Sequence, residues 1–357
     1  MTAVSATPHS LACVLPPFLL ERIAANGTDD QRRRALQILA VDTSLRATRQ
    51  QNSLLRGSRS AGRSSLVSAV PADVPQRSVH DAQNRETLPG VPRRQEGEPP
   101  TGDPAVDEAY DGLGATWTFY AEVYDRNSID DEGLPLLATV HYGEDYDNAF
   151  WDGSRMVFGD GDGQLFERFT RSLDVIGHEL THGVVEDEAS LIYLEQSGAL
   201  NESICDVFGS LVKQHALKQS AEEADWLIAA DLLGPDVQGS ALRSMKEPGT
   251  AYDDDVLGKD PQPAHLRDYV VTVKDNGGVH INSGIPNHAF YLAATSIGGY
   301  AWERAGRIWY DALRDSQIRP TTRFTAFARA TVRAAGQSFP DEVPAVRDAW
   351  SAVGIEV

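Results

Sequence analysis

The chain has 357 residues, 41% of them hydrophobic, and a formal net charge of −20. This length is sufficient for two lobes with substantial cores, and the composition excludes a wholly disordered or fibrous protein. The acidic charge argues against nucleic acid as a partner, and no apolar run is long enough to cross a membrane, so we expect neither partner.

Two short helices are predicted at the start of the chain. Pro16–Gly27 has prolines in its first turn and an Asn-Gly end, and Thr28–Gln31 has the spacing of a capping box that begins a second helix. From Ser44 to Gln76 the composition shifts to Arg, Ser, Gly and Gln. That stretch is typical of an exposed linker, where proteolytic cleavage is favoured.

No signal peptide is recognisable in the first residues. They lack a basic segment, and the apolar run Leu11–Leu20 is interrupted by two prolines. We therefore expect cytoplasmic residence, or secretion by a route that does not use such a signal.

The next part, residues 71–172, is predicted to form a mainly β lobe. Leu137–Tyr142 and Met156–Phe158 have the composition of strands, and Trp117–Val123 is a candidate helix. Gly159–Gly163 resembles half of a calcium loop but lacks the later glutamate, so we interpret it as a tight turn.

The central motif is HELTH, residues 178–182. Residues four apart on a helix share a face, so His178 and His182 can bind one metal ion with Glu179 beside them as a base. An apolar stripe at helical spacing supports a helix here: Leu173, Ile176, Leu180 and Val184. The alternative is a surface helix that carries two histidines by accident.

A second helix repeats this arrangement further along. Glu202 and Asp206 lie opposite an apolar stripe, which makes Glu202 a candidate third ligand and leaves a fourth position for water. Asp206, one turn later, can accept the free N–H of a ligand histidine. A solvated helix face is the alternative.

The remainder of 173–357 is predicted to be an α-helical lobe. Four further segments have apolar residues at helical spacing with glycine or proline between them: Ile285–Ile297, Ala301–Ser316, Thr322–Gln337 and Asp341–Val353.

Together these motifs resemble the thermolysin family of zinc endopeptidases, from about Ser78 to the C-terminus. The matching segments, besides HELTH and Asn201-Glu202, are Asn148–Trp151, Leu242–Met245 and Asp275–Gly284. The resemblance implies an α+β, two-lobed thermolysin-like fold with zinc between the lobes. Cys13–Leu20 is similar to the start of the protealysin subgroup, which implies that residues 1–70 are a short helical propeptide and cleavable linker.

The resemblance implies a zinc-dependent endopeptidase, made as a self-processing zymogen that its own propeptide inhibits. Glu179 would be the base, while Tyr193 and His280 would stabilise the oxyanion and Asp275 would orient His280. Taken singly, Tyr193 would be a buried aromatic residue, and His280, after two glycines, a histidine on a loop.

Substrate contacts are also implied by the resemblance. Asn148 and Ala149 would lie on an edge strand that pairs with an extended peptide, and Arg243 would bind the carbonyl just beyond the cleaved bond. An apolar pocket for the residue after that bond would be lined by Phe166, Phe169, Val175, Ile228 and Leu242. Cleavage is therefore expected on the N-terminal side of apolar residues.

One departure from the family concerns calcium. Its larger members bind two calcium ions with carboxylates, of which Asp174 and Asp225 remain here. Lys213, Leu227 and Ala230 occupy the other aligned positions. Because an ammonium group supplies no oxygen ligand, we expect the double calcium site to be lost and a Lys213–Asp174 ion pair to replace it.

The two cysteines, Cys13 and Cys205, indicate no disulfide framework. Cys205 is interpreted as a small core residue. Cys13 is either a zinc ligand that silences the zymogen or a small apolar residue beside the two prolines.

Two other functions share the motif. A zinc aminopeptidase would need carboxylates for a free amino terminus, whereas Asn148 and Arg243 suit an internal peptide. A zinc-stabilised binding protein would not need Glu179 as a base. Peptide or protein substrates are the expected partners, and the oligomeric state is left open.

Overall fold

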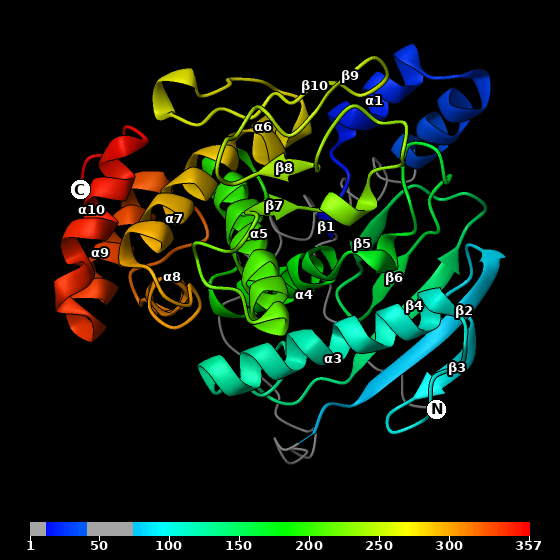
Figure 1. Ribbon diagram of the computed structural model, residues 1–357, viewed down its shortest axis with the longest axis horizontal. Helices are drawn as coiled ribbons and strands as arrows, with labels where there is room; N and C mark the ends of the chain where they lie inside the picture. The colour runs from blue at the N-terminus through cyan, green and yellow to red at the C-terminus, as the bar shows by residue number, and fades with distance from the viewer. Residues whose placement is uncertain (1–11, 41–73) are drawn as a thin grey trace.

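The computed structural model describes residues 12–40 and 74–357, apart from the side chains of residues 12 and 13. Most of the predicted linker lies outside the described residues. No helix in the described part of the chain is long and apolar enough to cross a bilayer. A β-rich lobe and a helical lobe meet at a central pair of helices, which confirms the predicted α+β architecture (Figure 1).

A mixed six-stranded sheet forms the first lobe, in the order β1-β5-β6-β4-β2-β3. Its strands are β1 Ala12–Cys13, β2 Arg77–Arg85, β3 Val91–Gln95, β4 Leu136–Tyr142, β5 Ala149–Trp151 and β6 Met156–Phe158. β4 and β6 agree with the predicted strands, whereas β2 and β3 were not predicted. The strand β1 pairs antiparallel with β5, so Ala12 and Cys13 add an edge strand to a sheet formed by later residues.

The helix α3, Pro104–Tyr124, is much longer than the predicted segment 117–123. It begins at Asp103, whose side chain accepts a hydrogen bond from the Ala105 N–H at 3.1 Å. The glycines in this segment disfavoured a helix in the prediction from sequence. In the structure, Gly112 has a packing role. A Cβ there would lie 2.3 Å from the Ile176 side chain, so glycine allows α3 to approach the next helix.

Two long helices, α4 (Leu173–Glu188) and α5 (Glu195–Leu217), pack closely between the lobes. Glycines make this approach possible: a Cβ on Gly177 would lie 3.1 Å from the Gly209 Cα, and a Cβ on Gly209 only 2.4 Å from the Asp174 carbonyl. The polar faces of the two helices therefore meet within reach of a common ion.

The helical lobe follows the predicted order of elements. Its helices are α6 Asp275–Asn282, α7 Gly284–Ile297, α8 Ala305–Leu313, α9 Phe324–Ser338 and α10 Val343–Ala352. α8 begins four residues later than predicted. Stacking of the Trp309 and Trp350 rings, with centroids 5.9 Å apart, joins α8 to α10 in the core.

Short elements complete the structure. They are β7 Leu227–Ile228, β8 Arg243–Ser244, β9 Asp253–Asp254 and β10 Gly258–Lys259, with the 3-10 helices η1 Phe169–Arg171, η2 Ala230–Leu232, η3 Leu266–Asp268 and η4 Pro340–Glu342.

The N-terminal segment forms both predicted helices. The first, α1, spans Pro17–Asn26. The second is helical over residues 29–40, and its capping box is present: Thr28 N–H donates to Gln31 Oε1 at 2.9 Å, and Gln31 N–H donates to Thr28 Oγ1 at 3.3 Å. In Figure 1, α1 lies at the upper right, beyond β1, which forms one edge of the six-stranded sheet.

Candidate active site

The histidine motif lies on α4, and all its polar side chains are buried. Ligand atoms of His178, Glu179 and His182 lie within 4.8 Å of one another. The two histidine Nε2 atoms are 3.1 Å apart. The surface-helix alternative is therefore wrong.

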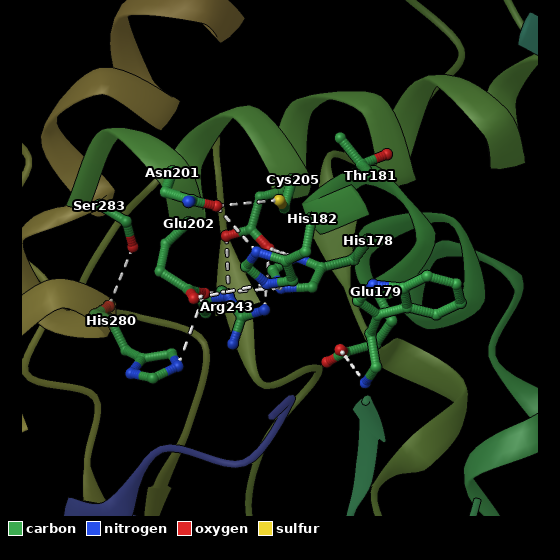
Figure 2. Close-up of polar contacts among 12 residues, drawn as sticks. His178, Glu179, Thr181, His182, Asn201, Glu202, Cys205, Arg243, His280 and Ser283 are labelled. Carbon is green, nitrogen blue, oxygen red and sulfur yellow. Dashed lines mark hydrogen bonds and ion pairs between the residues drawn. The ribbon is translucent and has the colours of Figure 1, made fainter. Parts of the chain in front are cut away.

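Glu202 on α5 provides the third donor group (Figure 2). Its two oxygens lie 3.5 Å from His178 Nε2 and 3.6 Å from His182 Nε2. Donors at about 2.05 Å from a tetrahedral zinc ion would be about 3.3 Å apart, so the observed triangle fits. Glu202 Oε2 is buried and accepts no hydrogen bond from the described residues. These three residues fit a zinc site with a fourth position open.

Two side chains on α5 orient the imidazoles. His178 Nδ1 lies 2.8 Å from Asp206 Oδ1, as predicted, and His182 Nδ1 lies 2.8 Å from Asn201 Oδ1. We had not predicted a role for Asn201, although an amide at a buried helix position is itself a sign of a hydrogen-bonding role. Each bond turns the other ring nitrogen, Nε2, toward the shared centre.

Asp206 also joins Arg243 to this network. Arg243 Nε and Nη2 both donate to the carboxylate at 2.8 Å, and Asn287 donates at 2.9 Å. Burial acts to raise the pKa of Asp206, but Arg243 and His178 outweigh it and lower the pKa to about 2. Arg243 Nη1 is buried without a hydrogen-bond partner among the described residues, so it is available to donate to a substrate carbonyl.

Tyr193 and His280 lie beside Glu202. The Tyr193 hydroxyl donates to Glu202 Oε1 and is 3.1 Å from His280 Nε2. Asp275 contacts His280 twice: its oxygens lie 2.6 Å from Nδ1 and 2.9 Å from the backbone N. The Tyr193 side chain is only half-buried, so it is not a core aromatic residue.

The expected loop position of His280 is wrong, because the residue lies in a helical turn of α6. Gly277 and Gly278 have φ angles of 85° and 77°, and the chain turns through them before it becomes helical. Asp275 accepts the His280 amide across this turn, which fixes both the backbone and the imidazole.

The predicted substrate strand is β5, and the N-terminal segment is paired with it. Asn148 Oδ1 accepts the Leu15 N–H at 3.1 Å, and the Ala149 carbonyl accepts the Val14 N–H at 3.2 Å. The Trp151 N–H donates to Glu179 Oε2 at 3.1 Å. The strand thus contacts both the candidate base and the N-terminal segment.

The five residues of the predicted apolar pocket are all buried. The rings of Phe166 and Phe169 are 6.1 Å apart, and the Leu242 N–H donates to the Ile228 carbonyl at 3.0 Å. Val175 lies in the first turn of α4. Their role as a pocket stays a prediction.

The Lys213–Asp174 ion pair is present. Lys213 Nζ donates to Asp174 at 2.9 Å, to Asp225 at 3.3 Å and to the Leu227 carbonyl at 3.0 Å. Burial acts to lower the pKa of Lys213, but Asp174 and Asp225 outweigh it and raise the pKa. Ala230 lies in η2 and offers no side-chain oxygen.

Cys205 is buried and unpaired, as expected of a core residue. The backbone of Cys13 pairs with Phe150, but its thiol lies outside the described residues. Both interpretations of Cys13 therefore stay open.

Comparison with known proteins gives the family. The model described as "Thermolysin metallopeptidase, catalytic domain" matches residues 79–186, and "Thermolysin metallopeptidase, alpha-helical domain" matches residues 189–355. An "Extracellular metalloprotease" of Pectobacterium carotovorum is 54% identical, with 97% of each chain covered. An "Extracellular minor metalloprotease" of Serratia marcescens is 44% identical, with 82% of this chain and 79% of the relative covered.

A solved structure is also similar over nearly the whole length. It is the "Precursor of Protealysin, Metalloproteinase from Serratia proteamaculans", with a TM-score of 0.87 and 50% identity, covering 96% of this chain and 99% of the other.

The expected localisation is corrected by these comparisons. Two of the relatives are extracellular by name, which points to secretion and overturns the expectation. That expectation was based on the lack of a recognisable signal peptide, which does not establish the location of a protein. The matches extend across the helical N-terminal segment and both lobes, and the chain therefore belongs to the thermolysin family of zinc metallopeptidases, with a propeptide as in the protealysin precursor.

Proposed function

We propose that this zinc metalloendopeptidase acts outside the cell, processes itself, and cleaves on the N-terminal side of apolar residues. The observation that carries the site assignment is the position of Glu202, within 3.6 Å of both histidine Nε2 atoms. His178, His182 and Glu202 would hold the ion. When bound, zinc lowers the pKa of a water molecule and polarises the scissile carbonyl.

The chain's own residues supply the remaining steps. Glu179 takes the proton of the attacking water and delivers it to the leaving amine. Its bond from the Trp151 N–H supports this role, because it holds the carboxylate beside the substrate strand. Tyr193 and His280 stabilise the charge that develops on the carbonyl oxygen. Asp275 keeps His280 in position.

Substrate binds β5 in an extended form. The bonds that Asn148 and Ala149 make with the N-terminal segment support this, because a substrate backbone presents the same donors. They equally support inhibition by the propeptide, which occupies the strand that a substrate needs. Arg243 Nη1 would then hold the carbonyl beyond the cleaved bond.

Specificity is assigned to the apolar pocket. An apolar side chain gains about 25 cal/mol per Å² removed from water, whereas an unpaired charge is costly to bury. We therefore expect leucine after the cleaved bond to be preferred over aspartate or lysine.

A set of end-blocked peptides that differ only at this position tests the proposal through kcat/KM. Cleavage inside an end-blocked peptide separates an endopeptidase from an aminopeptidase, which needs a free amino terminus. Loss of that cleavage when a chelator is added shows that the activity requires a metal ion. Equal rates for aspartate and leucine would refute the pocket. Self-processing is tested separately: the Glu179→Ala precursor should stay uncut in a protease-free preparation.

A further inference from the structure

Charge is divided unevenly along the chain. Residues 1–70 contain nine arginines and four acidic residues, a formal charge of +5, so residues 71–357 carry −25. The propeptide and the catalytic part therefore attract each other. Long-range attraction between exposed charges is screened by salt, so a lasting contact needs a buried pair.

Two propeptide residues form ion pairs with the catalytic part among the described residues. Glu21 is 2.7 Å from Lys274, but both side chains are largely exposed, at 45% and 68%. Arg34 is different. Its Nη2 lies 3.0 Å from Asp162, its Nη1 lies 3.4 Å from Asp145, and the two side chains of the shorter pair are 13% and 0% exposed.

The site that receives Arg34 is preformed by the backbone. Asp162 Oδ1 accepts the N–H groups of residues 164, 165 and 166 at 2.7–3.2 Å, so the carboxylate is fixed and Oδ2 faces Arg34. Asp147 is 4% exposed, and its Oδ1 has no hydrogen-bond partner among the described residues. We call Asp145, Asp147 and Asp162 the acidic cradle.

The carboxylates of this cradle repel one another, and a cation among them relieves that repulsion. Burial and the nearby Asp162 carboxylate raise the pKa of Asp147 well above its usual range, and Arg34 acts in the opposite direction. The cradle also adjoins the substrate strand, because Asp147 directly precedes Asn148, whose side chain holds the Leu15 amide. A cation in the cradle thus secures the propeptide next to its inhibitory strand.

We propose that the acidic cradle is a guanidinium-binding site by which the catalytic lobe holds the second propeptide helix, with Arg34 as its ligand. The proposal rests on the inhibitory role of the propeptide given above. The planar fork of arginine reaches two carboxylates at once, whereas an ammonium group is a single point charge. Arg34 is therefore the anchor of residues 29–40.

The test measures amide hydrogen exchange of residues 29–40 in the full-length chain that carries Glu179→Ala, which keeps the chain uncut. Arg34→Gln should speed exchange there by about 10–100-fold, because it removes a partly buried, charge-assisted pair. Arg33→Gln is the matched control: its pair with Asp30 is exposed, at 66% and 71%, and exchange should change less than about threefold. Arg34→Lys should lie between them.

Asp162→Asn tests the other side of the contact, because the amide oxygen can still accept the three backbone N–H groups. Its effect on the exchange of residues 29–40 should match that of Arg34→Gln. The double variant with both substitutions should exchange little faster than either single variant. Equal exchange in the Arg34→Gln and Arg33→Gln chains would overturn the proposal, as would independent effects in the double variant. No readout requires turnover, so a failed anchor and a failed protease assignment are distinguishable.

Discussion

The α4–α5 pair contains two clusters of buried carboxylates that neutralise their charge differently. At the zinc site, Glu202 and two histidines surround a point that an ion from solution can fill. Near the start of α4, Asp174 instead contacts Lys213, an ammonium group from the chain itself. The first arrangement leaves an open position for a reactive water, whereas the second is closed.

The comparison shows that burial alone does not define a metal site. Uncompensated buried charge is costly in both places, but only donors arranged around a shared point can exchange one cation for another. In the Lys213 cluster, the cation is covalently attached and cannot leave. The following predictions test whether the two clusters really differ in this way.

The largest expected effect is at the zinc site. Glu202→Gln replaces an anionic ligand by a neutral amide, so zinc content should fall and kcat/KM should drop by more than about 10³-fold. Metal analysis and peptide hydrolysis check this. The control is Glu195→Gln on the same helix, where the side chain is 61% exposed. Full zinc content in the Glu202 variant would break the assigned ligand set.

Lys213→Met should lower the free energy of unfolding by about 3–5 kcal/mol, because it leaves Asp174 buried without its cation. Urea unfolding gives the free energy of unfolding. Lys259→Met, at an exposed position, should cost less than about 0.5 kcal/mol. If the two variants were equally stable, the Lys213 cluster would not be a structural cation site.

A pair of carboxylates in the first lobe, Asp103 and Asp160, contacts His141, a cation whose charge depends on pH. Hydrogen bonding to Asp160, despite the opposing effect of burial and with help from Asp103, raises the pKa of His141 to about 9. The stabilisation is complete below the unfolded-state pKa of 6.5 and is lost as the pH rises through about 9.

Because His141 is partly exposed, we expect a loss of about 1 kcal/mol across this window. His141→Gln should flatten that part of the pH dependence, as measured by unfolding at each pH. An unchanged profile in this variant would show that the charge on His141 contributes nothing.

The smallest effect should be that of calcium on the native protein. With Lys213 already in the cluster, millimolar Ca²⁺ should raise Tm by less than about 1 °C, since an ion that does not bind the folded state adds no stability. Lys213→Glu should make Tm depend on calcium. A large, saturable rise in the unmodified chain would contradict the loss of the calcium site.

Much of the zinc site could be predicted because helical spacing is local. HELTH places two histidines on one face of a helix whatever surrounds them, and Glu202 and Asp206 share a helix face for the same reason, because they too are four residues apart. The bond of Asn201 to His182 could not be predicted without the crossing of α4 and α5, which depends on the glycine contacts between them.

The missed parts of the fold have similar causes. β2 was missed because its residues are mostly polar and its parallel partner β4 lies far along the chain, and β3 because it is a mostly exposed edge strand without an apolar alternation. Glycines obscured the first half of α3 because their packing role is visible only in three dimensions. Arg34 and Asp162 are 128 residues apart, and nothing local in the sequence indicates that they meet.

The central claim is that His178, His182 and Glu202 hold a zinc ion at which Glu179 acts as base. The most direct measurement compares zinc content and hydrolysis of an end-blocked peptide between the mature enzyme and its Glu179→Ala variant, with the propeptide of the variant removed by an added protease. The account predicts about one zinc per chain in both proteins and a rate loss of about 10²–10⁴-fold in the variant. A variant that kept zinc and hydrolysed the peptide within tenfold of the parent rate would contradict it.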